Sequence, residues 1–293
     1  MNPVTIRVPA TTANLGPGFD CFGCALKLYN TLTFEMLPTG LEITGCEEAY
    51  QNRENLAYVA YRAVMEKLGK PDFGVRIEIG GDIPVCRGLG SSAALLAAGA
   101  MAANCHMGEP LSREELLALT NAIEGHPDNL APALFGGLTA SMVAGGKPVR
   151  VSFPLDESWR FLVLIPEFTL STRLARSVLP EQVSREDAIF NISRSAMVLK
   201  ALETGNIELL KDALQDRLHQ PYRKALIPDY TAIEALVAPL EAGMCLSGAG
   251  PTILCLTRSN AVEQTLRREL PGVATHSWQV LCLTPDREGA RKI

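Results

Sequence analysis

The chain has 293 residues, of which 47% are hydrophobic and 20% are charged, and its formal net charge is −5. This length and composition predict a globular protein of about two domains. The negative charge argues against nucleic acid as the main partner, because no basic field would attract a phosphate backbone. The longest apolar run, residues 93–103, is too short for a membrane span, and the first residues lack a signal-peptide pattern, so we expect a cytoplasmic protein without a membrane partner.

The first half of the chain mixes short strands with helices. Alternating apolar residues predict a strand at 4–8, which we expect Pro9 to end, and further strands at 31–36 and 75–79. Asn55 has the position of an N-cap before a helix that Gly69 ends. Ser112 and Glu115 form a capping box at the start of another helix, which we expect Gly125 and Pro127 to end.

The pattern breaks at residues 145–160, and a buried strand at 161–165 opens a second block. We expect helices near 186–203, 206–218, 228–241 and 260–270, and strands at 244–247, 252–256 and 273–283. A Gly-Ala-Gly turn at 248–250 predicts a hairpin between two of these strands. The elements lack the strict β-α-β alternation of a doubly wound sheet, so the sequence predicts an α+β fold of two domains, residues 1–150 and 151–293.

Eight cysteines are scattered along the chain, and they include a single Cys-x-x-Cys pair, Cys21 and Cys24. A zinc or redox site needs a second such pair or a thioredoxin-like context, and the sequence has neither. We therefore expect reduced cysteines that act mostly as small buried hydrophobes.

A glycine-serine turn at residues 84–94, PVCRGLGSSAA, leads directly into an alanine-rich helix. The free N–H groups and the dipole of a helix N-terminus favour an anion, and glycines let backbone donors converge on it. The turn is not a Walker A loop, because no Gly-Lys pair is followed by Ser or Thr. It also matches the dinucleotide fingerprint at Gly88, Gly90 and Ala93, although residues 80–84 separate it from the preceding strand. A phosphate site, a dinucleotide turn and a simple helix cap all stay open.

Three further segments accompany this turn: PATTANLGPGFDCFGCAL at 9–26, EGHPDNLAPALFGGL at 124–138 and CLSGAGPTILCL at 245–256. Together the four segments resemble the motifs of the GHMP small-molecule kinases, in the order of that family and over residues 4–256. The segments at 9–26 and 124–138 resemble most the branch whose acceptor is L-homoserine. The resemblance implies an N-terminal domain like ribosomal protein S5, a C-terminal ferredoxin-like domain, and transfer of the γ-phosphoryl group of ATP to an alcohol, a reaction of threonine biosynthesis.

The resemblance also implies a nucleotide site. Its ATP-binding residues are Asn55, Pro84, Val85, Cys86, Arg87, Gly88, Leu89, Gly90, Ser91, Ser92, Ala93 and Ala94. Ser92 and Glu124 are the implied ligands of Mg²⁺, which suits a hydroxyl, a carboxylate and phosphate oxygens. A glutamate at the end of a helix is otherwise a solvated surface residue.

For the acceptor, the resemblance assigns Asp20 to the ammonium group, Asn14 to the hydroxyl, and Arg176 and Arg223 to the carboxylate of homoserine. His126 joins this substrate set, although a histidine before proline is also typical of a structural loop. Glu124, Asn14 and Asn129 are the implied catalytic residues, and no general base is assigned. Turn chemistry is the alternative for Asn14 and Asp20, and solvated helix charges for the arginines.

Three alternative functions stay open at this stage. The first is a GHMP kinase for another small alcohol, such as mevalonate, a sugar or a diphosphocytidyl polyol. The second is an NAD-dependent dehydrogenase that uses the glycine turn. The third is a non-catalytic relative that only binds. A homodimer is compatible with all of them.

Overall fold

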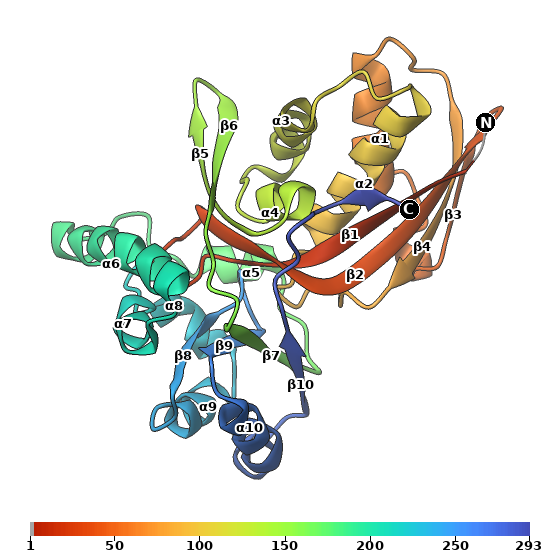
Figure 1. Cartoon of the computed structure of the whole chain (residues 1–293). Helices are drawn as coiled ribbons and strands as arrows, with labels where there is room; N and C mark the ends of the chain where they lie inside the picture. The colour runs from red at the N-terminus through yellow and green to blue at the C-terminus, as the bar shows by residue number, and fades with distance from the viewer. Residues whose placement is uncertain (1–2) are drawn as a thin grey trace.

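The computed structural model describes residues 3–293 and contains two β-sheets, each with helices packed against it (Figure 1). The first sheet has the strand order β11-β1-β2-β4-β3, and a β5–β6 hairpin joins it through β2. Its strands are β1 Val4–Ala13, β2 Phe22–Leu37, β3 Leu41–Thr44, β4 Gly74–Gly81, β5 Leu138–Ala144, β6 Lys147–Phe153 and β11 Arg291–Lys292. Every pairing in it is antiparallel except β3 with β4, as far as residues 3–293 are concerned.

Helices cover one face of this first sheet. They are α1 Leu56–Lys67, α2 Ser91–His106, α3 Arg113–Glu124 and α4 Leu130–Phe135. The alanine-rich α2 packs on β1 and against α1. A Cβ on Gly99 of α2 would overlap the backbone carbonyl of Ala57, so the lack of a side chain is what lets these two helices approach so closely.

The second sheet has the order β10-β7-β9-β8 and is antiparallel throughout the described residues. Its strands are β7 Arg160–Pro166, β8 Ala242–Leu246, β9 Ile253–Thr257 and β10 Trp278–Leu283. Helices α9 Tyr230–Val237 and α10 Asn260–Val273 pack on it. Buried residues such as Leu162, Ile253 and Leu266 form this second core.

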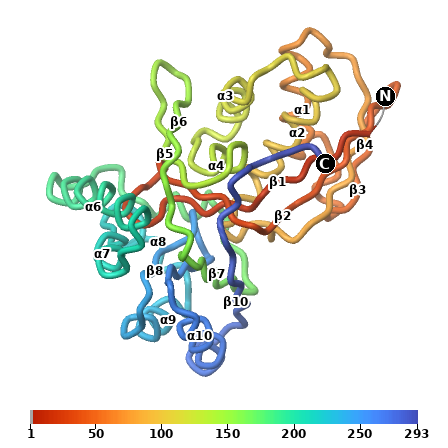
Figure 2. The backbone as a smooth tube through the Cα atoms, viewed as in Figure 1, coloured from red at the N-terminus to blue at the C-terminus, as the bar shows by residue number. Residues whose placement is uncertain are grey.

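Four further helices connect β7 to α9: α5 Thr172–Ser177, α6 Arg185–Thr204, α7 Ile207–Ala213 and α8 Gln220–Arg223. Short 3-10 helices follow β3 and α8, at Glu48–Tyr50 and Lys224–Leu226. The end of the chain then returns from the second sheet to the first, where β11 pairs with β1 (Figure 2). The expected division near residue 150 stays a prediction.

Many of the expected elements are confirmed. The fold is α+β, the Asn55 side chain caps α1, and both hydrogen bonds of the Ser112–Glu115 capping box are present. The hairpin around residues 248–250 joins β8 to β9. In residues 3–293, no helix combines the length and the hydrophobicity needed to cross a membrane.

Several expected boundaries are wrong. Pro9 does not end β1, because the strand absorbs it at a register shift between Pro9 and Ala10. The helix expected at 206–218 ends at Ala213, since residues 214–219 form a loop, and α10 runs to Val273, which delays β10 until Trp278. The break at 145–160 contains a hairpin turn and β6.

The cysteines are unpaired, as expected, but only Cys24, Cys245 and Cys255 are buried. The others are partly or fully exposed, because they lie on loops and at the margins of elements. Burial raises the pKa of Cys24 to about 12, so its thiol is inert near neutral pH.

Candidate active site

A cavity of about 460 Å³ brings together residues from both halves of the chain. Its walls come from the loop after β1, the turn before α2, the loop between α3 and α4, and helices α5 and α8. Of the predicted site residues, the following line it: Asn14, Asp20, Asn55, Val85, Cys86, Arg87, Gly88, Gly90, Ser91, Ser92, Glu124, His126, Asn129, Arg176 and Arg223. Pro84, Leu89, Ala93 and Ala94 do not line it; Leu89, Ala93 and Ala94 belong to the buried core that supports the turn.

The turn at residues 84–90 has a backbone that only glycine adopts readily. Gly88 and Gly90 have φ angles of +74° and +68°, in the left-handed region. A Cβ on Gly88 would overlap the carbonyl oxygen of Ser247, and one on Gly90 would overlap the hydroxyl of Thr11. The backbone is therefore packed tightly from behind, while the N-terminus of α2 at Ser91 and Ser92 faces the cavity. This arrangement presents free N–H groups and a helix dipole to an anion.

The second half of the chain holds this turn in place. Ser247 Oγ donates a hydrogen bond to the carbonyl of Gly88 at 2.6 Å. Arg87 donates from Nε to the Pro166 carbonyl at 3.0 Å and from Nη2 to the Glu167 carbonyl at 2.6 Å. The single cationic side chain of residues 84–94 thus anchors the turn to the end of β7 through two main-chain contacts. A third hydrogen bond, from Arg87 Nη1 to the Val85 carbonyl at 3.1 Å, braces the turn internally.

Ser92 and Glu124 lie in contact in the cavity wall, beside the turn that precedes α2. Ser92 Oγ donates to Glu124 Oε2 at 2.7 Å. Glu124 is the last residue of α3, and Gly125 follows it as a left-handed C-cap. Residues 3–293 contain no group of three His, Cys, Asp or Glu side chains that would hold a metal by themselves. The donor set here is one hydroxyl and one carboxylate, which leaves most positions of an octahedral cation to phosphate oxygens and water.

The loop after β1 carries Asn14 and Asp20, both with positive φ angles. Asn14 Nδ2 donates to the Gly248 carbonyl at 2.7 Å, and Asn14 Oδ1 accepts from the Asp20 N–H at 3.0 Å. The Asp20 carboxylate accepts two hydrogen bonds from the Arg176 guanidinium, each of 3.0 Å. This hydrogen bonding raises the pKa of Arg176, so its guanidinium is charged at neutral pH.

Arg223 is the most unusual charge of the cavity, because its side chain is buried with only 1% exposure. Its Nε donates to the Ala175 carbonyl at 3.0 Å, and its Nη1 lies 3.3 Å from His219 Nδ1. No carboxylate within residues 3–293 forms an ion pair with it. Burial, reinforced by the charge of Arg176, lowers the pKa of Arg223 to about 10, which still leaves it charged at neutral pH. A buried cation without a carboxylate partner favours an anionic ligand.

The loop between α3 and α4 contributes His126, Asp128 and Asn129. His126 Nδ1 lies 2.9 Å from Asp128 Oδ1, and this hydrogen bond raises the pKa of His126 despite partial burial. Asn129 Oδ1 accepts from the Thr11 hydroxyl at 2.7 Å, which fixes the amide against β1.

Sequence reasoning missed part of the cavity wall. Asn30, Tyr50, Asn52 and Glu54 also line it, and they come from β2 and from the 3-10 helix region before α1. No motif marks them, because they reach the cavity only through the fold. Asp216 and His219 behind Arg223 were also missed, because their contacts arise from burial, which the sequence does not show.

Comparison with known proteins agrees with this arrangement. The family described as "GHMP kinases N terminal domain" matches residues 55–137, and "GHMP kinases C terminal" matches residues 198–273. A homoserine kinase of Clostridium botulinum (strain ATCC 19397 / Type A) is 45% identical over 288 residues, 98% of this chain and 97% of that protein. One of Caldicellulosiruptor saccharolyticus is 43% identical over 294 residues, covering 98% and 96%.

A solved structure gives the same result for the fold. The crystal structure of homoserine kinase from Cytophaga hutchinsonii superposes with a TM-score of 0.88 at 25% identity, covering 100% of this chain and 98% of that one. The chain therefore belongs to the GHMP kinases, in the family whose curated members carry the name homoserine kinase.

Proposed function

We propose that this protein transfers the γ-phosphoryl group of ATP to the side-chain hydroxyl of L-homoserine, which gives ADP and O-phospho-L-homoserine, a step of threonine biosynthesis. The observation that carries the proposal is that one cavity has two different binding groups. One is a glycine turn with free N–H groups, and the other is Arg223, which is buried and forms no ion pair with a carboxylate of the described residues. The first group suits a phosphate chain, and the second suits the carboxylate of an amino acid.

At the phosphate end, main-chain donors replace the lysine of a Walker A loop. The main-chain N–H groups of the lining residues Gly88, Gly90, Ser91 and Ser92 and the dipole of α2 would hold the β- and γ-phosphates. The Ala94 N–H is not available for this, because it donates to the Gly90 carbonyl at 2.9 Å. Asn55 lines the same cavity, and the adenine would lie beside it. The rigid anchoring of the turn keeps these donors in place before ATP arrives, so little free energy is lost in ordering them.

Mg²⁺ fits the residues beside the turn. Ser92 and Glu124 would hold it, since their oxygens already lie within 2.7 Å of each other in the cavity wall. When bound, the cation neutralises charge that develops on the transferred phosphoryl group. Among the side chains described, only the Ser92 hydroxyl donates a hydrogen bond to the Glu124 carboxylate.

At the acceptor end, Asp20 would bind the ammonium group, and Arg176 and Arg223 the carboxylate. In the unliganded cavity Asp20 and Arg176 satisfy each other. A zwitterion offers each of them an alternative partner of opposite charge, so binding exchanges one ion pair for two, and Arg176 shares the carboxylate with Arg223. Because Arg176 and Asp20 are 42% and 32% exposed, this exchange costs little desolvation.

The hydroxyl would lie between the two ends. Asn14 projects from the same loop as Asp20, and its amide is held by the Gly248 carbonyl. Asn129 and His126 line the cavity from the loop between α3 and α4, with Asn129 fixed by Thr11 and His126 by Asp128. These groups orient the hydroxyl toward the γ-phosphorus, and orientation is the main requirement of phosphoryl transfer.

The alternatives fit less well. A neutral sugar or polyol would leave Arg223 buried without an anion, and mevalonate offers no ammonium group for Asp20. A dinucleotide fingerprint belongs to a parallel β-α-β unit, in which the strand before the turn and the strand after the helix share one sheet region in parallel. Here β4 precedes the turn, but β5, the strand that follows α2, pairs within the described residues with β2 and β6 and not with β4. The cytoplasmic location and the homodimer stay predictions.

An ADP-release assay tests the proposal. Purified protein is given MgATP with L-homoserine, L-serine, L-threonine or mevalonate, and thermal protection by MgATP and NAD is compared. We expect turnover with homoserine well above that with the other acceptors, and protection by MgATP alone. Equal turnover of mevalonate, or protection by NAD only, would contradict the assignment.

A further inference from the structure

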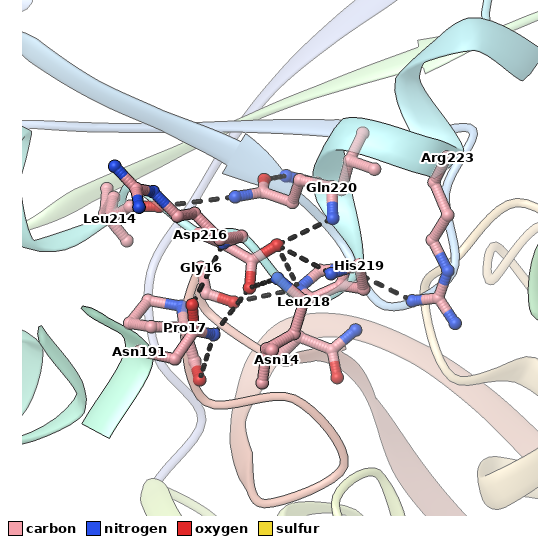
Figure 3. A network of polar contacts seen from close by, with 12 residues as sticks. Asn14, Gly16, Pro17, Asn191, Leu214, Asp216, Leu218, His219, Gln220 and Arg223 are labelled. Atoms are coloured by element: carbon pink, nitrogen blue, oxygen red, sulfur yellow. Dashed lines mark hydrogen bonds and ion pairs between the residues drawn. The ribbon is translucent and has the colours of Figure 1, made fainter. Parts of the chain in front are cut away.

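A buried polar network lies directly behind Arg223 and the loop that carries Asn14 and Asp20 (Figure 3). Its centre is His219, whose side chain is completely buried and does not line the cavity. His219 Nε2 lies 2.8 Å from the Gly16 carbonyl, and Nδ1 lies 3.3 Å from Arg223 Nη1. One imidazole ring thus touches both the acceptor loop and the buried arginine.

The two partners define which nitrogen of the ring carries the proton. A carbonyl only accepts, so Nε2 of His219 must be the donor to Gly16. A guanidinium only donates, so Nδ1 must be the unprotonated acceptor from Arg223. Both bonds are satisfied by a single neutral tautomer, and burial favours that neutral form by lowering the pKa of His219.

Asp216 fixes the position of the ring. Its buried carboxylate accepts from the backbone N–H groups of Leu218, His219 and Gln220, at 3.0, 2.9 and 2.6 Å. These bonds close the loop that leads into α8, of which Arg223 is the last residue. Asp216 therefore determines where α8 begins and how His219 is presented.

Asn191 of α6 extends the network to the acceptor loop. Its Nδ2 donates to Asp216 Oδ1 at 2.6 Å and to the Pro17 carbonyl at 3.2 Å. The ring of Phe19 stacks on His219 with a centroid distance of 5.1 Å, and the Arg223 guanidinium lies 5.0 Å from the centre of the Phe19 ring. The carbonyls of Gly16 and Pro17 are thus both held from behind, between Asn14 and Asp20.

From this geometry we infer that His219 is a positioning residue, which sets the distance between Arg223 and the loop of Asn14 and Asp20 and so fits the cavity to an α-amino acid. The inference rests on the proposed function, since it assigns the two ends of the substrate to these groups. His219 does not touch the substrate. It acts by holding the carboxylate-binding arginine and the ammonium-binding loop in one rigid unit.

The test compares His219→Phe with His219→Gln. Phenylalanine keeps the stacking on Phe19 but removes both hydrogen bonds, whereas the glutamine amide again offers a donor and an acceptor. A hydrogen bond to a charged group is worth about 1.5–3 kcal/mol, so we expect the KM for homoserine to rise about tenfold or more in His219→Phe. The KM for ATP should change less than about twofold, and His219→Gln should recover part of the loss.

A matched control is His276→Phe, which removes hydrogen bonds from a histidine that contacts Asp229 in the second sheet region and lines no part of the cavity. It should lower the Tm without changing the KM for homoserine. In an Arg223→Ala background, His219→Phe should add little, because its effect acts through that arginine.

The outcomes separate the two proposals. Wild-type protein that does not phosphorylate homoserine refutes the proposed function. Active wild type with an unchanged KM for homoserine in His219→Phe refutes only the positioning role, as does an equal rise in the KM for ATP. Should His219→Phe fail to fold, His219→Asn carries the same measurement, because its shorter side chain cannot reach both Gly16 and Arg223; a KM for homoserine that stays at the wild-type value in His219→Asn would overturn the inference.

Discussion

Replacement of Gly88 by alanine tests whether the glycine turn holds the phosphates by its main-chain shape. Gly88 has a φ of +74°, and an added Cβ would overlap the Ser247 carbonyl and lie 2.9 Å from the Gly250 carbonyl oxygen. Both obstacles are backbone atoms, which cannot rotate away. The turn must therefore move toward the cavity, and the 2.6 Å hydrogen bond from Ser247 Oγ to Gly88 is strained or lost.

Gly146→Ala is the matched control. Gly146 has a φ of +75°, nearly that of Gly88, but a Cβ there would meet no atom within 4 Å. Both variants incur the cost of a left-handed alanine, about 1–2 kcal/mol. Gly88→Ala adds overpacking of about 1–3 kcal/mol. We expect the Tm to fall by about 2–4 °C in Gly146→Ala and by about 4–10 °C in Gly88→Ala, at about 2 °C per kcal/mol for a chain of this length.

The kinetic readout separates the site from general stability. A displacement of about 1 Å at a reacting group can cost about 10²-fold in rate, so kcat/KM for ATP should fall at least tenfold in Gly88→Ala. Gly146→Ala should keep the wild-type value, because the β5–β6 turn lies outside the cavity. The assay is ADP release with varied MgATP at 25 °C, where both variants are folded. The same kcat/KM for ATP in the two variants would refute the reasoning.

Three other outcomes are expected. Glu124→Gln should raise the Mg²⁺ concentration needed for half-maximal turnover by at least about tenfold, and unchanged turnover at limiting Mg²⁺ would reject its role as a ligand. Arg223→Ala should raise the KM for homoserine far more than that for ATP; an effect confined to ATP would overturn its assignment. Burial alone would raise the pKa of Asp229, but hydrogen bonds from Thr275, Trp278 and His276 outweigh it and hold that pKa well below its usual range. The ionised carboxylate therefore stabilises the fold above about pH 4, and this stabilisation is lost as the pH falls further. Asp229→Asn should lower the free energy of unfolding by about 1–3 kcal/mol at pH 7 and by less near pH 3, measured with urea; a difference that does not change with pH would contradict the prediction.

The elements that local chemistry determines were predictable from the sequence. Asn55, Ser112 and Gly125 lie at the ends of helices α1 and α3 as expected, because a cap needs only its neighbours in the chain. The prediction that Pro9 ends β1 is wrong, because the effect of this proline depends on a partner strand far away in the chain. Whether a proline ends a strand depends on whether the partner strand tolerates a register shift, and β2 does so opposite Pro9.

The candidate site, too, could be predicted only in part. Resemblance to family motifs named most of the cavity, including Arg176 and Arg223 from segments that the sequence alone presents as solvated helix charges. It did not indicate that Arg176 is held by Asp20 while Arg223 has no carboxylate, since that difference arises from burial. Nor did it indicate Asn191, which lies 25 residues before Asp216 in the chain but donates to its carboxylate at 2.6 Å.

Because the turn before α2 has no Walker-type lysine, mutations of the side chains that hold its backbone should affect nucleotide binding. A flexible lysine can follow a phosphate that shifts, but main-chain N–H groups have no such freedom. The turn at residues 84–90 must therefore be held rigidly by other side chains, and Arg87 and Ser247 hold it through hydrogen bonds to main-chain carbonyls. Arg87→Lys keeps the positive charge beside the phosphates but cannot reproduce the contacts to the Pro166 and Glu167 carbonyls. If rigidity rather than charge is what binds ATP here, this conservative change weakens nucleotide binding; if charge is what matters, it leaves binding intact.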